Sequence, residues 1–132
     1  MGLPSHMGPM LLIPGVSLAG SGGLSGKFNN AAAKSITGTP VGGLINGAEK
    51  ITLWIVVSAI SGTLGVNAES SPDGINLTSG GALGKVSGIT TPGTYQITYN
   101  GTPISMIGLD WTLGTATDTC TIDGIFFEGS LA

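Results

Sequence analysis

The feature that most constrains the fold is an apolar run at residues 51–57, ITLWIVV. It is rich in β-branched and aromatic residues, which predicts a strand buried on both faces or nearly so. After a Ser61-Gly62 break, apolar and polar residues alternate over residues 64–69, which predicts a strand with one buried face. The following segment, residues 70–74 (SSPDG), is typical of a tight turn. Residues 50–74 are therefore expected to supply two core strands and their turns.

The rest of the chain repeats this pattern. Glycine contributes 24 of the 132 residues, and because it costs about 1 kcal/mol per helical position relative to alanine, a helical protein is disfavoured. Residues 93–99 alternate cleanly, with Tyr95, Ile97 and Tyr99 on one face. In the final segment Cys120 and Ile122 share a face until Gly124, a candidate β-bulge, interrupts the alternation.

Two Asn-Gly pairs, Asn46-Gly47 and Asn100-Gly101, predict β-hairpin turns. Five or six strands are then expected between residues 50 and 128, at the spacing of a sandwich or barrel. Their apolar faces need a second layer to cover them. The predicted fold is an all-β antiparallel β-sandwich, jelly-roll or Ig-like, over residues 44–132.

Residues 1–43 are expected to form an extended, Pro/Gly-rich N-terminal arm. Spaced prolines favour extended chain and lack amide donors for a strand ladder. Only 8% of the residues are charged, against a usual share of about 25%, which indicates a surface covered by copies or partners. Apolar side chains of the arm are the candidates for filling pockets on a neighbour: Leu3, Met7, Met10, Leu11, Leu12 and Ile13.

Charge and residue types argue against several functions. The net charge is −3 with four Lys and no Arg, which disfavours nucleic-acid and anionic-membrane binding. The prolines in the apolar stretch at residues 7–18 disfavour a membrane span or cleaved signal, so synthesis in the cytoplasm is expected. Cys120 is the single cysteine and His6 the single histidine, too few for a zinc site, so no metal or cofactor is predicted.

No catalytic residues are predicted either. His6 lies in the arm, far in sequence from any strand end that could carry a nucleophile. The carboxylates show no spacing that singles out an acid–base pair. Asp118 and Asp123 are expected to be solvent-facing positions. The chain is therefore expected not to be an enzyme.

Three segments resemble a recurrent pattern of small tailed-bacteriophage virion proteins: residues 71–76 (SPDGIN), 92–95 (PGTY) and 113–124. The resemblance covers roughly residues 44–129. The sequence departs from the pattern at Asn76-Leu77, where a Trp often follows, and at residues 105–111, which replace a basic strand. The resemblance implies a virion structural β-sandwich of the capsid cement or decoration type.

The resemblance implies that the chain is a cement protein, which lies on the capsid exterior and stabilises the head. It would bind between major capsid subunits, or to other virion proteins, as a homo-oligomer with a trimer favoured by interlocking arms. The alternative is a carbohydrate-binding module of a tail or baseplate. That role would use exposed aromatic residues among Trp54, Tyr95, Tyr99 and Trp111.

Overall fold

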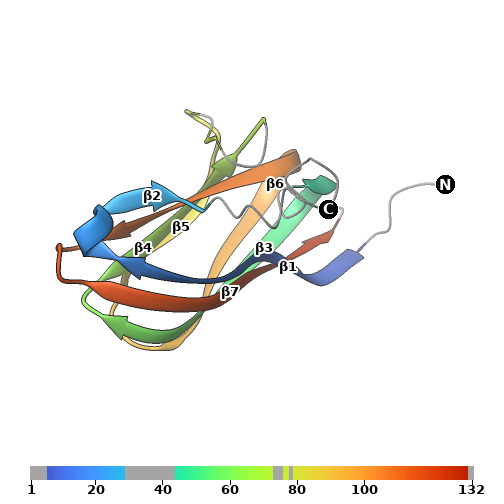
Figure 1. The fold of residues 1–132 in the computed structure, drawn as a ribbon. Helices are drawn as coiled ribbons and strands as arrows, with labels where there is room; N and C mark the ends of the chain where they lie inside the picture. Colours follow the sequence, from blue (N-terminus) through green and yellow to red (C-terminus); the bar gives the residue numbers. More distant parts are fainter. Residues whose placement is uncertain (1–5, 29–43, 73–75, 78, 131–132) are drawn as a thin grey trace.

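The computed structural model describes residues 6–28, 44–72, 76–77 and 79–130. Its strands form two antiparallel four-stranded sheets, consistent with the predicted β-sandwich (Figure 1). The elements are β1 (His6–Ala19), the 3-10 turn η1 (Gly20–Gly22), β2 (Ser25–Lys27), β3 (Leu44–Ser61), β4 (Leu64–Ser70), β5 (Ala82–Ile89), β6 (Gly93–Leu113) and β7 (Thr119–Ser130).

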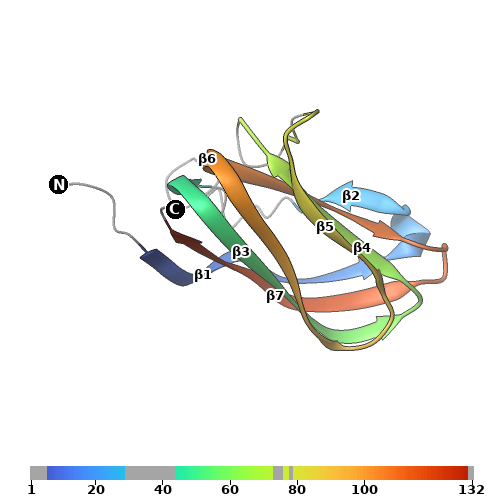
Figure 2. The ribbon, with the colours of Figure 1, turned by 180° about the vertical axis from the view of Figure 1, so that it is seen from behind.

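One strand belongs to both sheets. The N-terminal part of β6 pairs with β3 in sheet A, whose order is β1-β7-β3-β6. Its C-terminal part, residues 107–113, pairs with β4 in sheet B, where β2 and β5 are the outer strands. Figure 2 shows β6 running from one layer to the other. The long strand therefore joins the two layers covalently.

The core lies between the sheets. Strand β3, expected from its apolar run to be buried on both faces or nearly so, alternates between buried and partly exposed residues. Ile51, Leu53, Ile55 and Val57 are each at most 2% exposed, while the residues between them on β3 are half-buried. Thus β3 has one fully buried face and one partly covered face. The alternation of β4 and β6 is confirmed by buried residues on one face of each strand: Leu64, Val66, Ala68, Ile97, Ile107, Leu109 and Leu113.

The prediction of β-hairpin turns at the two Asn-Gly pairs is wrong. Asn46-Gly47 lies within β3 and Asn100-Gly101 within β6. The β3–β6 register shifts around both pairs, so these residues are accommodated as bulges in one continuous ladder. The Tyr99 hydroxyl donates to the carbonyl of Thr102 at 2.9 Å, bridging the irregular segment of β6.

The bulge predicted near Gly124 is confirmed. Gly124 pairs with Val56 and Ile122 with Val57, so Asp123 is the extra residue on β7. The bulge moves the buried positions from even to odd numbers along the strand. As a result Ile125 and Phe127 face the core, and the intervening Phe126 faces outward.

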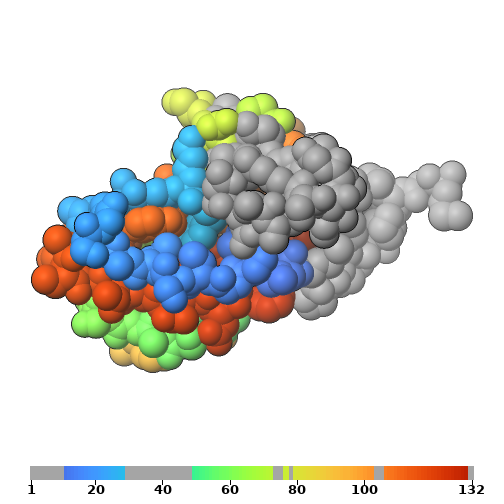
Figure 3. All heavy atoms as spheres, viewed as in Figure 1, coloured from blue at the N-terminus to red at the C-terminus, as the bar shows by residue number. Residues whose placement is uncertain are grey.

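The predicted boundary between arm and sandwich is corrected, because residues 6–28 are part of the sandwich. Strand β1 is the edge strand of sheet A beside β7, and β2 pairs with β6 in sheet B. Leu18 and Phe28 are buried, at 8% and 4% exposed. Figure 3 shows the blue segment from β1 through η1 to β2 curling around orange atoms of β6. The remaining residues of the expected arm lie outside the described residues.

Asp118 joins two turns at one end of the sandwich. Its carboxylate accepts hydrogen bonds from the Thr115 hydroxyl at 2.6 Å and from the backbone N–H groups of Thr63, Gly114 and Thr115 at 3.0–3.1 Å. Gly62 has φ +100° and leaves no room for a Cβ beside that carboxylate. Asp118 is only 7% exposed, so the expectation of a solvent-facing aspartate is wrong here. We call this arrangement the Asp118 clasp.

Candidate functional site

A patch of large apolar side chains lies on the outer face of sheet A. We call Leu11, Pro14, Trp54, Val56 and Phe126 the outer patch. Leu11 is 50% exposed, and the other four are half-buried. Trp54 and Val56 alternate with buried β3 residues, so their side chains lie opposite the core. A partly exposed apolar cluster of this kind is a candidate interaction site.

The centre of the outer patch is a row of directly opposed residues. Phe126 on β7 pairs with Leu11 on β1 and with Trp54 on β3, and Trp54 pairs with Gln96 on β6. Directly opposed side chains on one face of a sheet lie about 4.5–5.5 Å apart at Cβ. The register therefore places an aliphatic and two aromatic side chains side by side.

Gly124 lets two of these side chains lie close to the sheet. A Cβ at this position would be 3.2 Å from Leu11 Cδ1 and 3.2 Å from Phe126 Cε2. The lack of a side chain on Gly124 thus leaves space that Leu11 and Phe126 occupy. The outer patch is consequently a continuous surface across β1, β7 and β3.

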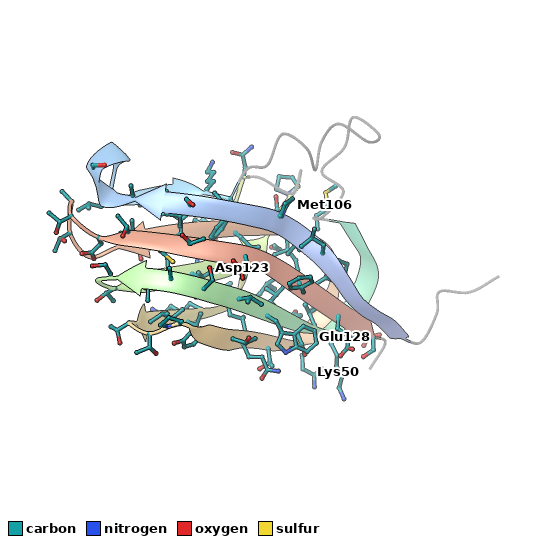
Figure 4. The ribbon with its side chains drawn as sticks, turned by 60° about the horizontal axis from the view of Figure 1, so that its bottom comes forward. Lys50, Met106, Asp123 and Glu128 are labelled. Atoms are coloured by element: carbon teal, nitrogen blue, oxygen red, sulfur yellow. The ribbon has the colours of Figure 1, made fainter. Side chains whose placement is uncertain are left out.

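Few charges border the outer patch. In Figure 4, Lys50 and Glu128 lie toward one end of sheet A, and Asp123 lies on β7 farther along. Lys50 pairs in register with Ser130, and Glu128 with Thr52, so the two charged residues lie on neighbouring strands at the same end. Lys50 and Asp123 are exposed and Glu128 is half-buried.

The six residues predicted as an interface have different locations. Leu12 and Ile13 are buried in the chain's own core at 2% and 9% exposed, so their assignment to a neighbour's pockets is corrected. Leu11 is exposed and belongs to the outer patch. Met7 and Met10 lie in β1 opposite Gly129 and Phe127, and their side chains are outside the described part. Leu3 lies outside the described residues.

Three of the four candidate sugar-binding aromatics pack against the core. The Tyr95 hydroxyl donates to the Thr91 carbonyl at 2.6 Å, and the Tyr99 hydroxyl is similarly bonded to Thr102. Trp111 packs against the core, and its ring lies against Gly26, where a Cβ would be 2.8 Å from Cζ2. Trp54 alone of the four belongs to the outer patch.

A shallow hollow of about 370 Å³ lies on the outer face of sheet B. Lys27, Asp110, Asn67 and Lys85 follow one another in register across β2, β6, β4 and β5. Gly65 leaves the floor of the hollow open, since a Cβ there would be 2.8 Å from the Thr112 hydroxyl oxygen. Lys27 Nζ donates to Asn76 Oδ1 at 2.7 Å.

Asp110 in this hollow has a raised pKa. Burial disfavours the ionised carboxylate and is the main cause, and the negative charge of Glu69 adds to it. A hydrogen bond from Asn67 acts in the opposite direction. Because the folded state binds the Asp110 proton more tightly than the unfolded chain does, this group reduces stability as pH rises above its ordinary pKa.

We therefore expect Asp110→Asn to raise the melting temperature by about 1–3 °C at pH 7. The gain should disappear near pH 3, where the wild-type carboxyl is protonated in both states. Thermal melts at the two pH values measure the effect, and Asp123→Asn, at an exposed position, serves as the control. Equal shifts in both variants would contradict the assignment to the Asp110 environment.

Other reactive groups offer no built site in the described part of the chain. The Cys120 thiol is buried, and burial raises its pKa. Among the described residues there is no group of three or more His, Cys, Asp or Glu side chains that could hold a metal ion. None of the described helical structure is long and apolar enough to cross a bilayer.

Comparison with protein-family models, curated protein sequences and solved structures finds no match to this chain. A function for this chain therefore has to be proposed from its surface geometry and from the sequence resemblance described above. Sequence reasoning identified Leu11 and Trp54 as candidates but missed Phe126, Val56 and Pro14. The adjacent pair Phe126-Phe127 just after Gly124 was the available signal, because one of two neighbouring strand residues must face outward.

Proposed function

We propose that this chain is a non-enzymatic structural protein of a tailed-phage virion, of the capsid cement or decoration type. In this role it works as an oligomer and stabilises the head by binding between major capsid subunits on the capsid exterior. The proposal combines the resemblance of residues 44–129 with one structural observation, the outer patch. No bond is made or broken in this function, because stabilisation comes from burying surface between proteins.

The outer patch supports protein docking through the kind of side chains it contains. Aromatic residues, and Trp and Tyr most of all, carry much of the binding energy in protein interfaces when a partner covers them. Trp54 and Phe126 are held at the centre of a four-stranded sheet, so little conformational freedom is lost when they are covered. Lys50 and Glu128 lie toward one end of the sheet, as at the polar rim of an interface, while Asp123 lies within β7 beside the outer patch.

The docking mechanism differs from the one expected from sequence. Residues 6–28 complete the chain's own sheets, so docking is assigned to the sandwich surface rather than to a free arm. A trimer held by interlocking arms would need a free N-terminal arm. Residues 6–19 instead form β1, which pairs with β7 of the same chain, so they do not support such a trimer. The oligomer is therefore proposed to form through the sheet face.

The proposal predicts that the protein is a component of intact particles and that Trp54 is needed for its incorporation. Immunogold labelling of purified phage particles that encode the chain should mark the head. Trp54→Thr keeps a strand-forming residue at a partly exposed site, so we expect a folded protein whose incorporation falls about tenfold or more.

The matched control is Lys85→Thr, which changes an exposed strand position on the opposite sheet and should be incorporated normally. Particles that lack the protein would refute the virion role. Labelling confined to the tail would refute the cement role in favour of a tail or baseplate position.

The alternative, a tail or baseplate carbohydrate-binding module, depends on Trp54. A second shallow hollow of about 430 Å³ lies on the same sheet face, with Thr52, Thr98 and Asn100 among its lining residues. Trp54 does not line this hollow but lies two residues from Thr52 on the same face of β3, and a partly exposed indole can stack on a sugar ring. Titration with host surface polysaccharide, followed by tryptophan fluorescence, tests this alternative: saturable quenching that Trp54→Thr abolishes would favour it over the cement role.

A further inference from the structure

We propose that the outer patch binds the outer patch of a second copy of this chain, about a two-fold axis that runs parallel to the strands between β3 and β7. The inference rests on the proposed function only in treating this face as a protein-docking surface. It adds which surface of the second copy is bound and the symmetry axis of the pairing.

The strand order makes the central row self-complementary. Because β3 and β7 are neighbours, rotation about this axis places β3 of one copy over β7 of the other. Trp54 and Phe126 are directly opposed in register, so Trp54 comes to face the partner's Phe126, and Phe126 faces the partner's Trp54. Facing sheets pack about 10 Å apart, a distance that two large interdigitating side chains fill. Two aromatic pairs thereby form at the centre.

The charged residues at one end of sheet A are also complementary under this two-fold rotation. Lys50 on β3 lies one strand away from Glu128 on β7, and both lie at the same end of the sheet (Figure 4). Exchange of β3 and β7 therefore brings Lys50 near the partner's Glu128, and Glu128 near the partner's Lys50. Opposite charges meet twice in this arrangement. A capsid subunit need not offer this complementarity, whereas a second copy does so by symmetry.

The position of Asp123 distinguishes this two-fold axis from a second axis that would also bring the two outer patches face to face. An axis across the strands near Trp54 would reverse the strands and bring Lys50 toward the partner's Asp123, because these residues lie on opposite sides of the Trp54–Phe126 row. The axis parallel to the strands instead places Asp123 over the uncharged Val56–Val57 step of the partner's β3, on the far side of the Trp54–Phe126 row from Lys50. Substitution of Asp123 is therefore a control that depends on orientation.

The test is a charge exchange in the full-length protein. Lys50→Glu places like charges opposite each other twice in the homodimer, and Glu128→Lys does the same with positive charges. We expect each variant alone to dimerise about tenfold or more weakly than wild type, and an equimolar mixture of the two to recover dimer as the heterodimer. Sedimentation equilibrium measures the dissociation constants, and thermal melts establish that each variant is folded.

Asp123→Lys should leave the dissociation constant within about twofold of wild type. A mixture that stays monomeric, or a loss in Asp123→Lys as large as that in Lys50→Glu, would overturn the proposed axis. Wild-type protein that remains monomeric at about 100 µM would overturn self-pairing altogether. Labelling of phage heads in that last case would keep the cement role and remove only the oligomer from it, so the cement role and self-pairing are tested separately.

Discussion

Replacing Leu12 by alanine is expected to lower the free energy of unfolding by about 2–5 kcal/mol. Leu12 is 2% exposed and lies in the core between the sheets, at a position where β1 has one extra residue relative to β7. The bulge allows Leu12 and Ile13 both to reach the core. Truncation to alanine removes buried methyl groups and leaves a cavity that the two sheets cannot easily close. Urea denaturation monitored by tryptophan fluorescence measures the loss.

The neighbouring residue supplies the matched control. Leu11 is 50% exposed on the other face of the same strand, so Leu11→Ala should cost less than about 1 kcal/mol in the isolated protein. The two variants make the same chemical change one residue apart. Equal, small effects would mean that β1 contributes nothing to the core and that the chain behaves as a sandwich with a separable arm.

Removing the Asp118 carboxylate is the second large perturbation. Asp118→Ala removes the carboxylate acceptor of the Thr63 and Thr115 amides and one of the two acceptors of the Gly114 amide, at the end of the sandwich where the β3–β4 and β6–β7 turns meet. We expect the melting temperature to fall by about 5 °C or more, while Asp123→Ala should change it little. Gly62→Ala tests the same clasp from the other side, because its methyl group would collide with the carboxylate from a backbone with positive φ.

The clasp also gives a pH dependence of defined sign. The Thr115 hydroxyl, then the Thr63 amide and the other two N–H donors, hold the pKa of Asp118 below its ordinary value of 3.8. The stabilisation is therefore fully present above that value and is lost as pH falls through the lower pKa of the folded state. In melts from pH 7 down to pH 2.5, wild type should lose its advantage over Asp118→Ala only at the acid end. A constant difference across this range would contradict the role assigned to the ionised carboxylate.

The sequence predicts those features of the sandwich that depend on the order of apolar and polar residues within a single strand. Alternation over residues 64–69 and 93–99 predicts which side chains face the core, and the structure confirms it. The apolar run at residues 51–57 predicted a strand, but not that one of its faces is only partly covered. Asn46-Gly47 and Asn100-Gly101 misled because the same backbone freedom that suits a hairpin also suits a bulge in a long ladder. Only the pairing of β3 with β6 decides between these two outcomes.

The N-terminal segment misled for a different reason. Its prolines lack amide donors, but an edge strand has a partner on one side only, and β1 is the edge of sheet A. The buried position of Asp118 was equally hidden, because its donors come from turns more than fifty residues apart in sequence. The outer patch depends on the β3–β7 register and on the bulge at Asp123. The sequence could therefore single out Trp54 as a candidate surface aromatic, but it could not show that Phe126 lies directly beside it.

The sharing of β6 between two sheets has a consequence for biosynthesis. Strands β1 and β2 are made early, yet their partners are β7 and β6, which leave the ribosome much later. Sheet B lacks the strand that joins β2 to β4 until the second half of β6 emerges, and β3 has no neighbour in sheet A until the first half does. Among the described strand pairs, only the β4–β5 hairpin can form before β6 emerges, so most apolar segments stay without their partners until late in synthesis. Folding waits until β7 is made, and until then the β3 segment is a potential site for chaperone binding or aggregation.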